Sequence, residues 1–205
     1  MTESNNKACK DKSPKIRVRD RIFEAAAELF YRQGVHNVAI DTIVEEAQTN
    51  KMSLYRNFQS KDELVVEYIK QLNSRFEFEL NRILSENDTN ARAAIVAIFA
   101  NFAERPKEET CHGCPSANIA IELRGQFHPA LEPIFQIRES FRDILFELSK
   151  SAGAKDPKIL ANTLVLLFEG CVLSKVTFSE QQWPGANVRL IVENLLDKEL
   201  GVQST

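Results

Sequence analysis

Apolar residues along this chain recur at intervals of three and four, the spacing that gives a helix one buried face. The first such segment covers residues 17–33, and Gly34 behind it can supply a left-handed stop. A shorter apolar set follows at residues 40–47, and after a polar break residues 51–58 complete a pair of short helices. The pattern predicts a three-helix unit at the start of the chain.

The next segment begins with Ser60 and Glu63, which form a capping box, Ser-x-x-Glu, at the start of a helix. Behind it one apolar face continues for about six turns, or roughly 30 Å. Further helices are predicted at residues 91–104, 115–123, 129–150, 157–178 and 187–200. We therefore expect an all-α fold of about nine helices, in which an N-terminal helix-turn-helix domain is joined by a long helix to a C-terminal helical bundle.

Charge changes this picture only when it is counted by region. The 205 residues carry a net charge of −3, which by itself gives no indication of a nucleic-acid partner. Residues 1–61, however, hold 11 basic and 8 acidic residues, a net of +3, whereas residues 62–205 hold 15 and 21, a net of −6. Positive charge is therefore concentrated at the end with the paired short helices, as a phosphate-contacting surface requires.

The compartment is expected to be the cytoplasm. The longest uninterrupted apolar run, residues 93–100, has eight residues and falls short of the ~18 needed to cross a membrane. The N-terminus has no apolar core of the secretory type. Four scattered cysteines are too few for a disulfide scaffold. We predict no membrane contact, no cofactor and no metal.

The third predicted helix has the right length for the DNA major groove. Leu54 and Phe58 face inward, while hydrogen-bonding side chains on the other face reach bases or phosphates, and Met52 either contacts a thymine methyl or packs. Tyr55 and Lys61 suit phosphate contacts more than base reading. The predicted DNA-binding residues are Ala39, Thr42, Lys51, Met52, Ser53, Tyr55, Arg56, Asn57 and Lys61.

Residues 16–76 resemble the DNA-binding domain of the TetR family of transcriptional regulators. The resemblance is carried by Ile-Val-Glu-Glu-Ala at 43–47 and by Lys-Met-Ser-Leu-Tyr-Arg-Asn-Phe-Gln-Ser-Lys-Asp-Glu-Leu at 51–64. Its Tyr-x-x-Phe spacing followed by Ser-Lys-x-Glu-Leu is distinctive of that family. Residues 1–15 are polar and Lys-rich without an apolar period, which predicts a flexible basic tail. The resemblance implies a DNA-binding domain at 16–76 and a ligand-binding and dimerisation domain at 77–205.

Two departures from the family pattern affect the three predicted helices at residues 17–58, which we call the DNA-reading unit. Where the family often has Thr before the second helix, this chain has Val38 and Ala39, so either Asn37 caps that helix or the contact is missing. The turn usually reads Ala-Gly-Val-Ser, but Gln48 stands here in place of the Gly. If the turn requires a positive φ, Gln48 carries a strain of about 1 kcal/mol.

The resemblance also implies a homodimer that binds a palindromic operator, is usually a repressor, and releases the DNA when a small-molecule effector of unknown identity tilts the long helix. The last two predicted helices are apolar on more than one side, so one side can pack in the core and another against a partner. The predicted dimer residues are Leu160, Leu164, Leu167, Cys171, Ser174, Leu190 and Leu195. The predicted effector-pocket residues are Phe99, Phe102, Cys114, Asn118, Phe135, Phe141 and Phe168.

Cys111 and Cys114 form a Cys-x-x-Cys sequence for which several interpretations stay open. Cys114 either begins a helix beside the pocket, as in one branch of the family, or pairs with Cys111 as a redox dithiol or metal site. The chain has no Gly-rich phosphate loop, nucleophile elbow or His-Glu-x-x-His sequence, so we do not expect an enzyme. The alternative to a DNA-binding regulator is a thiol-based redox or metal-responsive protein centred on these two cysteines.

Overall fold

A computed structural model describes residues 17–104 and 112–201, and every regular element in these two ranges is helical. This confirms the predicted all-α fold. The α-helices are α1 (Val18–Gln33), α2 (Ile40–Glu46), α3 (Lys51–Asn57), α4 (Lys61–Glu86), α5 (Ala91–Ile98), α6 (Pro115–Glu122), α7 (Leu131–Ser151), α8 (Pro157–Thr177) and α9 (Val188–Leu200). The observed bounds agree with the predicted segments to within one or two residues for most of them.

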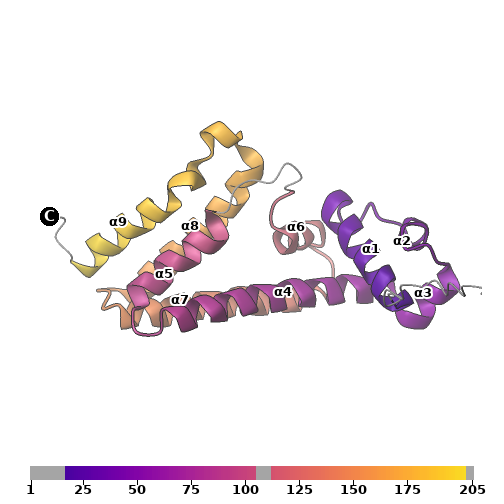
Figure 1. Ribbon diagram of the computed structural model, residues 1–205, viewed down its shortest axis with the longest axis horizontal. Coiled ribbons are helices and arrows are strands. Elements are labelled where there is room, and N and C mark those ends of the chain that lie inside the picture. The colour runs from indigo at the N-terminus through magenta and orange to yellow at the C-terminus, as the bar shows by residue number, and fades with distance from the viewer. Residues whose placement is uncertain (1–16, 105–111, 202–205) are drawn as a thin grey trace, which may run out of the picture.

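The long helix α4 is the axis of the molecule (Figure 1). At one end it carries α1, α2 and α3, and toward its other end it packs against α5 and α7. The predicted capping box begins it: the backbone amide of Glu63 donates to Ser60 Oγ at 3.1 Å, and Glu63 Oε2 accepts from the amide of Gln59. Because this cap fixes where α4 starts, it also fixes the position of α3 just before it.

Buried apolar residues form two separate cores. The first joins α1, α2, α3 and the first part of α4, and it includes Ile119 and Leu123 of α6. The second joins the last part of α4 to α5, α7, α8 and α9. The two cores meet along α4 between Ile69, which belongs to the first, and Leu80, which belongs to the second. α6 therefore packs with the N-terminal unit, although it belongs to the C-terminal part of the sequence.

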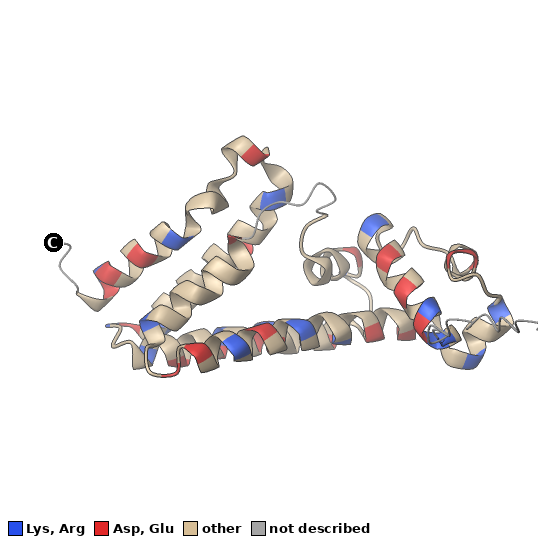
Figure 2. Cartoon of the chain, viewed as in Figure 1, with Lys and Arg blue, Asp and Glu red and all other residues tan. Residues whose placement is uncertain are grey.

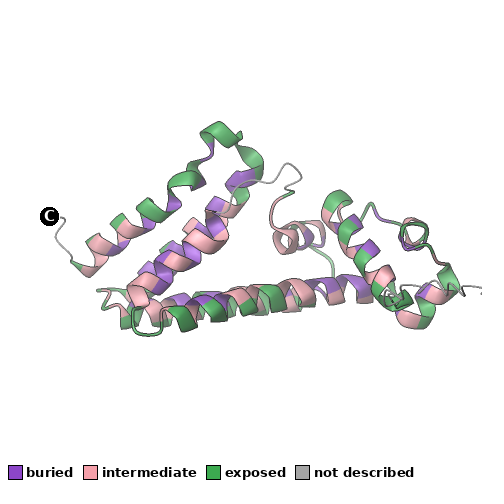
Figure 3. Ribbon diagram, in the orientation of Figure 1, coloured by how far each residue is buried: buried purple, intermediate pink, exposed green. Residues whose placement is uncertain are grey.

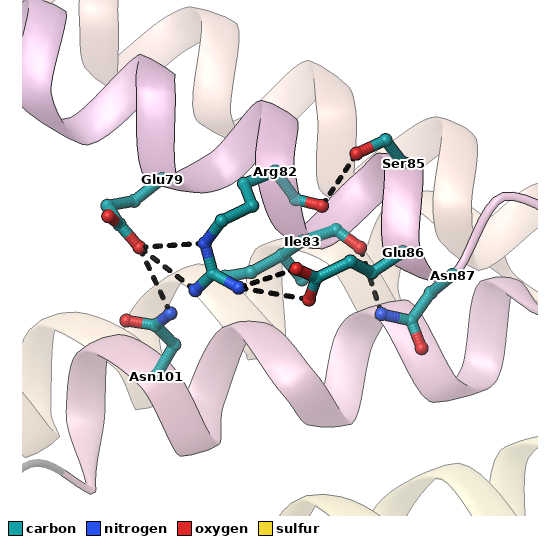
Figure 4. Close-up of polar contacts among 7 residues, drawn as sticks. All are labelled: Glu79, Arg82, Ile83, Ser85, Glu86, Asn87 and Asn101. Carbon is teal, nitrogen blue, oxygen red and sulfur yellow. Dashed lines mark hydrogen bonds and ion pairs between the residues drawn. The ribbon is translucent and has the colours of Figure 1, made fainter.

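The predicted helix at residues 91–104 changes its geometry halfway. It is α-helical to Ile98 and continues as a π-helical segment, Phe99–Ala103. The wider turn buries Phe99 and places Asn101 against α4, where its Nδ2 donates to Glu79 Oε2 at 3.4 Å (Figure 4). π-helical turns are rare and frequently mark functional sites.

On α4 the same carboxylate belongs to an ion-pair network (Figure 4). Arg82 lies between Glu79, at 3.0 Å, and Glu86, at 2.8 Å. Hydrogen bonds from Arg82 to the carboxylates of Glu86 and Glu79 raise the pKa of its guanidinium, and the bond to Glu86 has the larger effect. The pairs are exposed and contribute little stability, but they join one side of α4 to the π-helical segment.

Helix α8 has the length and mean hydropathy, 1.7 over its most apolar window, of a membrane-spanning helix. Only a third of that window is buried within the protomer. One side of α8 packs against α7, and its other side is largely exposed. Figure 3 shows the corresponding division on α9, which has exposed residues on its outer side and buried residues toward α5. A core or subunit-contact helix of a soluble protein has the same composition, so α8 alone is weak evidence for a membrane span.

Candidate nucleic-acid interface and ligand cavity

The turn between α2 and α3 sets the angle of the candidate recognition helix. Gln48 has φ +49°, and it is the one non-glycine residue with a positive φ in the part of the chain described. The turn thus requires the conformation that makes Gly usual in the family, and Gln48 carries a strain of about 1 kcal/mol. Asn50 follows as the N-cap of α3, because its Oδ1 accepts from the backbone amide of Ser53 at 2.9 Å.

Helix α3 has one buried side and one exposed side. Leu54 is fully buried in the first core, and Phe58 at the C-cap is buried beside it. The exposed side carries a stripe of four predicted DNA-binding residues, namely Lys51, Met52, Tyr55 and Arg56. At about 100° per residue, these four positions fall within an arc of about 140°, so their side chains share one side of the helix. The structure therefore brings together the central part of the predicted set.

Several of these side chains already have partners within the protomer. Lys51 Nζ lies 2.7 Å from Asp41 Oδ1, and the hydrogen bond to Asp41 raises the pKa of the Lys51 ammonium. Arg56 Nη2 lies 3.4 Å from the sulfur of Met52. Asn57 Nδ2 donates to the carbonyl of Ser53 at 2.8 Å. The amide of the half-buried Asn57 is therefore hydrogen-bonded within α3, whereas the four side chains of the exposed stripe are accessible from outside.

Residues from α1 and α4 surround the C-terminal end of α3. The guanidinium of Arg19 lies 4.6 Å above the ring of Phe58 and pairs with Glu67 at 2.5 Å. Figure 2 shows Lys and Arg residues close together at the start of α1 and on α3. Lys61 lies at the first position of α4, where partial burial lowers the pKa of its ammonium. Cations and the free amides of a helix start are both suited to phosphate contacts.

The start of α2 differs from the family pattern, as its sequence predicted. Ala39 is the exposed N-cap of α2 and forms no side-chain cap, and Thr42 is half-buried one turn further on. Asn37 does not cap α2, because its Nδ2 donates to the carbonyl of Gln33 at the end of α1. The interpretation of Asn37 as the cap of α2 is therefore wrong, and α2 begins without a side-chain cap.

A cavity of about 390 Å³ lies where the two cores meet. Leu72, Asn73 and Phe76 of α4 form one wall, and residues 113–116 before and at the start of α6 form another. Four of the predicted pocket residues line it, namely Phe102, Cys114, Phe141 and Phe168. The cavity therefore lies along α4 between the N-terminal helices and the C-terminal helices.

The other three predicted pocket residues lie elsewhere. Phe99 is fully buried in the second core, where its ring packs edge-on against Phe168 at 5.9 Å. Asn118 donates through Nδ2 to the carbonyl of His112 at 2.7 Å and stays outside the described lining. Phe135 is exposed on the outer side of α7. The abundance of phenylalanine in the C-terminal part did not show which of these residues lie in the core, which line the cavity and which are exposed.

Five polar side chains in the cavity wall were missed by the sequence analysis: Tyr31, Asn73, Ser116, Arg138 and Lys175. Arg138 replaces an apolar residue in the inward stripe of α7, between Ile134 and Phe141. Lys175 likewise continues the buried stripe of α8 after Cys171, and it is only 9% exposed. A charged residue inside an apolar stripe was the available signal for both.

Cys114 lies at the N-cap of α6 and in the cavity wall, as its helix-start interpretation predicted. Its sulfur lies 3.2 Å from Ser116 Oγ and 3.5 Å from Arg138 Nη2. Cys111, the other half of the Cys-x-x-Cys sequence, lies outside the described residues. Within the described ranges no three metal-ligating side chains come together.

Helix α6 also contacts the DNA-reading unit directly. Glu122 accepts a hydrogen bond from the backbone amide of His36 at 3.0 Å, and its carbonyl lies 2.9 Å from His36 Nε2. Gly34, with φ +79°, leaves room for this carboxylate, since a Cβ there would lie 2.6 Å from Glu122 Oε1. Before α6, the backbone amide of His112 donates to Tyr31 Oη at 3.1 Å. The start of α6 thus forms part of the cavity wall, and its last residue is hydrogen-bonded to the turn that follows α1.

The exposed apolar surface of α8 is not the predicted one. Leu160, Leu164, Cys171 and Ser174 are buried in the protomer's own core and are not available to a partner subunit. Their burial is explained by the packing of α8 on α7, which occupies that side. The exposed stripe contains Ile159, Leu166 and Leu173, which are 61%, 74% and 60% exposed.

Helix α9 continues this apolar surface. Leu190, which belongs to the predicted dimer residues, is exposed together with Ile191. Leu167 and Leu195, the remaining predicted residues, are half-buried against the second core. Figure 2 shows few charged residues along α8.

Comparison with known proteins places the DNA-reading unit in a recognised family. Residues 22–68 match the family model of bacterial regulatory proteins of the tetR family. The chain is 29% identical over 183 residues to the HTH-type transcriptional regulator YdgC of Bacillus subtilis, covering 76% of this chain and 93% of that protein. It is also 22% identical to the HTH-type transcriptional regulator LmrA of the same organism, covering 88% and 97%.

Solved structures agree over nearly the whole chain. A TetR-family transcriptional regulator from Streptomyces coelicolor superposes with a TM-score of 0.82 at 25% identity, covering 89% of this chain and 96% of that one. A TetR-type regulator from Streptomyces avermitilis superposes with a TM-score of 0.74 at 27% identity, covering 88% and 98%. The similarity therefore includes the C-terminal helices as well as the matched DNA-reading unit.

Proposed function

The chain belongs to the TetR family of DNA-binding transcriptional regulators, and on that premise we propose that it is a homodimeric repressor that releases a palindromic operator when an effector fills the cavity. The observation that carries this proposal is the exposed stripe of α3. Leu54 is buried on the opposite side of the helix and so fixes which side chains face outward. The stripe is presented to a ligand by a strained turn at Gln48. A protein that did not use this face would gain stability by relaxing that turn.

In the proposed complex α3 lies in the major groove. Lys51, Met52, Tyr55 and Arg56 face the DNA, and Lys61 adds a phosphate contact from the start of α4. Arg56 is the best candidate for base reading, because a guanidinium donates two parallel hydrogen bonds to the edge of guanine. Asp41 holds Lys51 in the free protein, so DNA binding exchanges that exposed ion pair for a phosphate.

The proposed dimer interface is the exposed apolar surface of α8 and α9. Leu166 and Leu173 lie seven residues apart, so they form one stripe along α8. Gly170 lies between them, and among the described residues no atom other than the adjoining backbone lies within 4 Å of the place where a Cβ would be. A glycine there lets a second helix approach closely, while the aliphatic side chains on either side gain burial. Dimerisation also presents two α3 helices to two half-sites of a palindrome.

The proposed release mechanism uses α6 and α4. A ligand in the cavity contacts Tyr31 of the DNA-reading unit and residues 113–116 at the start of α6. The other end of α6 is held to His36 by Glu122, so displacement of α6 moves the end of α1. The conformation that fits the ligand then differs from the one that fits DNA, and the ligand shifts the population toward the former.

Fluorescence anisotropy with a labelled duplex from upstream of the protein's own gene tests DNA binding. We expect tight binding that weakens steeply as salt is raised, because bound phosphates release counterions when cations replace them. The variant Arg56→Ala should weaken binding to that duplex at least tenfold. Arg32→Ala, at an exposed position of α1 with a similar charge change, is the matched control and should bind normally. Equal affinity for an unrelated duplex of the same length would contradict a specific operator.

A further inference from the structure

We propose that the effector of this cavity is an uncharged molecule with a flat aromatic body, and that the wall selects against both anions and cations of the same shape. The proposal rests on the proposed function only in treating the cavity as an effector site. The rings of the wall recognise the aromatic body, and both cations of the described wall already have partners within the protein.

Four phenylalanine rings in the wall favour a flat aromatic body. Phe76 lies at the centre of the group, with its ring centroid 4.8 Å from Phe102, 5.3 Å from Phe141 and 6.4 Å from Phe168. All four rings line the cavity, and they meet one another edge-on or tilted rather than stacked. Such a group offers both ring faces and ring edges, which another aromatic ring can contact in its preferred offset or T-shaped geometry. A saturated ring gains burial there without this geometry.

The rest of the wall favours an apolar body of drug size. Aliphatic side chains from three helices lie beside the rings, namely Leu72 of α4, Ile137 of α7 and Val172 of α8. The cavity, at about 390 Å³, is within the range that encloses a drug-sized ligand. A ligand therefore gains affinity mainly by burying apolar surface.

Arg138 of α7 is one of the two cations in the described wall, and its charge is already balanced within the protein. Its guanidinium pairs with Glu169 of α8, and both side chains are partly buried. Its Nη2 also lies 3.4 Å from Ser116 Oγ and 3.5 Å from Cys114 Sγ. A ligand anion that took Arg138 would leave the carboxylate of Glu169 without its partner, a costly change for a partly buried charge. This ion pair therefore disfavours an anionic ligand.

Lys175 of α8 is the other cation of the described wall, and contacts within the protein hold it as well. It is 9% exposed, and its Nζ lies 5.2 Å from the centre of the Trp183 ring. Trp183 is fixed in turn, because its Nε1 donates to Ser174 Oγ at 2.9 Å. A cation over the face of an aromatic ring is stabilised by the electrons of that ring, so Lys175 does not depend on a ligand anion for a partner.

A ligand cation is disfavoured for a different reason. The described lining residues include two positive side chains and no aspartate or glutamate, so a ligand ammonium meets two like charges and no counterion there. A ligand charge of either sign also loses its hydration when it enters an apolar site. An uncharged ligand avoids these costs and keeps its contacts with the rings.

Calorimetry on the full chain without DNA tests the proposal with four probes of similar length. They are biphenyl-4-carboxamide, biphenyl-4-carboxylate, the cation 4-phenylbenzylammonium and the saturated bicyclohexyl-4-carboxamide. We expect the biphenyl carboxamide to bind at least tenfold more tightly than either ion, because both ions lose hydration on entering the cavity. It should also bind at least threefold more tightly than the saturated carboxamide, which lacks aromatic faces and edges.

Two variants test the charge argument and the ring argument separately. Glu169→Gln removes the carboxylate that pairs with Arg138, so carboxylate binding should rise at least tenfold while binding of the biphenyl carboxamide stays within twofold. Glu139→Gln, at an exposed position of α7 outside the described lining, is its matched control. Phe76→Leu should weaken binding of the biphenyl carboxamide about fivefold and binding of the saturated carboxamide less than twofold. Phe78→Leu, at an exposed position of the same helix, is its control.

The wild-type comparison decides the proposal even if a variant fails to fold. Either ion or the saturated carboxamide binding as tightly as the biphenyl carboxamide would overturn it, and so would the absence of binding by all four probes at millimolar concentration. Unchanged carboxylate binding in a folded Glu169→Gln variant would contradict the role given to the ion pair. A separate arm adds the biphenyl carboxamide to the protein bound to its upstream DNA. Selective binding without DNA release would leave the ligand class standing and contradict the proposed release mechanism instead.

Discussion

The two hydrophobic cores of this protein are built from similar residues but differ in what surrounds them. The first core is closed beneath α3, and that helix exposes mainly polar and charged side chains, whereas the other end of this core reaches the cavity at Tyr31 and Leu72. The second core borders a cavity of about 390 Å³ and exposes aliphatic side chains on α8 and α9. A closed core holds a surface in one shape, whereas a core with a cavity and an uncovered apolar side can still bind a ligand and a second subunit.

The strongest way to break this comparison is to make the uncovered side of the second core polar. The double variant Leu166→Glu/Leu173→Glu should produce a folded monomer in sedimentation equilibrium, because four carboxylates would meet in the proposed interface. Its affinity for DNA should fall at least a thousandfold, or about 4 kcal/mol, because a monomer contacts one half-site only. Phe135→Glu, at an exposed apolar position on α7, is the control and should remain a dimer. A double variant that still dimerises would place the interface elsewhere.

The second prediction compares equivalent truncations at two places, the closed interior beneath α3 and the wall of the cavity. Leu54→Ala should lower the free energy of unfolding by about 3 kcal/mol, because it leaves a void in close-packed surroundings. Leu72→Ala should lower it by only about 1 kcal/mol, because that side chain already borders the cavity. Urea denaturation followed by circular dichroism measures both. Equal losses would show that the cavity wall is packed as closely as the interior beneath α3.

The third prediction concerns the polar surface that the closed core presents. Tyr55→Ala should weaken DNA binding about tenfold, by about 1.4 kcal/mol, without changing the melting temperature, because the side chain is exposed and packs on little. Lys61→Met should reduce the slope of log affinity against log salt by about one, since one phosphate contact is lost. Anisotropy titrations at several salt concentrations measure both. A large loss of thermal stability in either variant would instead show that the residue stabilises the fold.

The smallest expected effect lies in the turn that aims α3. Gln48→Gly should raise the free energy of unfolding by about 0.5 kcal/mol, because Gly adopts φ +49° without steric cost, although it gains entropy in the unfolded chain. Differential scanning calorimetry measures the change. Gln59→Gly, at an exposed loop position before α4, is the control and should be neutral or destabilising. A clear loss of stability in Gln48→Gly would mean that the glutamine side chain stabilises the turn.

Local signals were enough to predict the helices and the DNA-reading unit. The capping box of Ser60 and Glu63 depends on residues close in sequence and was predicted correctly. The positive φ that the family's glycine suggested for the turn is found at Gln48, and the cap of Asn50 is equally local. The exposed side of α3 could be predicted from the helical period alone, because burial of Leu54 decides which side chains of this helix face outward.

The cavity and the subunit surface depend on contacts between helices that are far apart in sequence. Arg138 and Lys175 lie in apolar stripes, but which stripe faces a cavity is decided by α4 and α6. In α8 two sides are apolar, and the packing of α7 decides that Leu160 and Leu164 are buried while Leu166 is not. A helix that is apolar on more than one side carries too little periodicity to make that choice from sequence.

Selection of binding sites from a random duplex library tests the central claim most directly, because the library contains every short operator sequence and none has to be chosen in advance. The purified full chain is incubated with the library, and the bound duplexes are recovered and sequenced over several rounds. The account predicts two inverted half-sites whose centres are separated by one helical turn, about 34 Å, or a multiple of it. Enrichment should be lost with Arg56→Ala and with Leu166→Glu/Leu173→Glu. Recovery of no common sequence, or of a single half-site that the monomeric variant selects equally well, would contradict it.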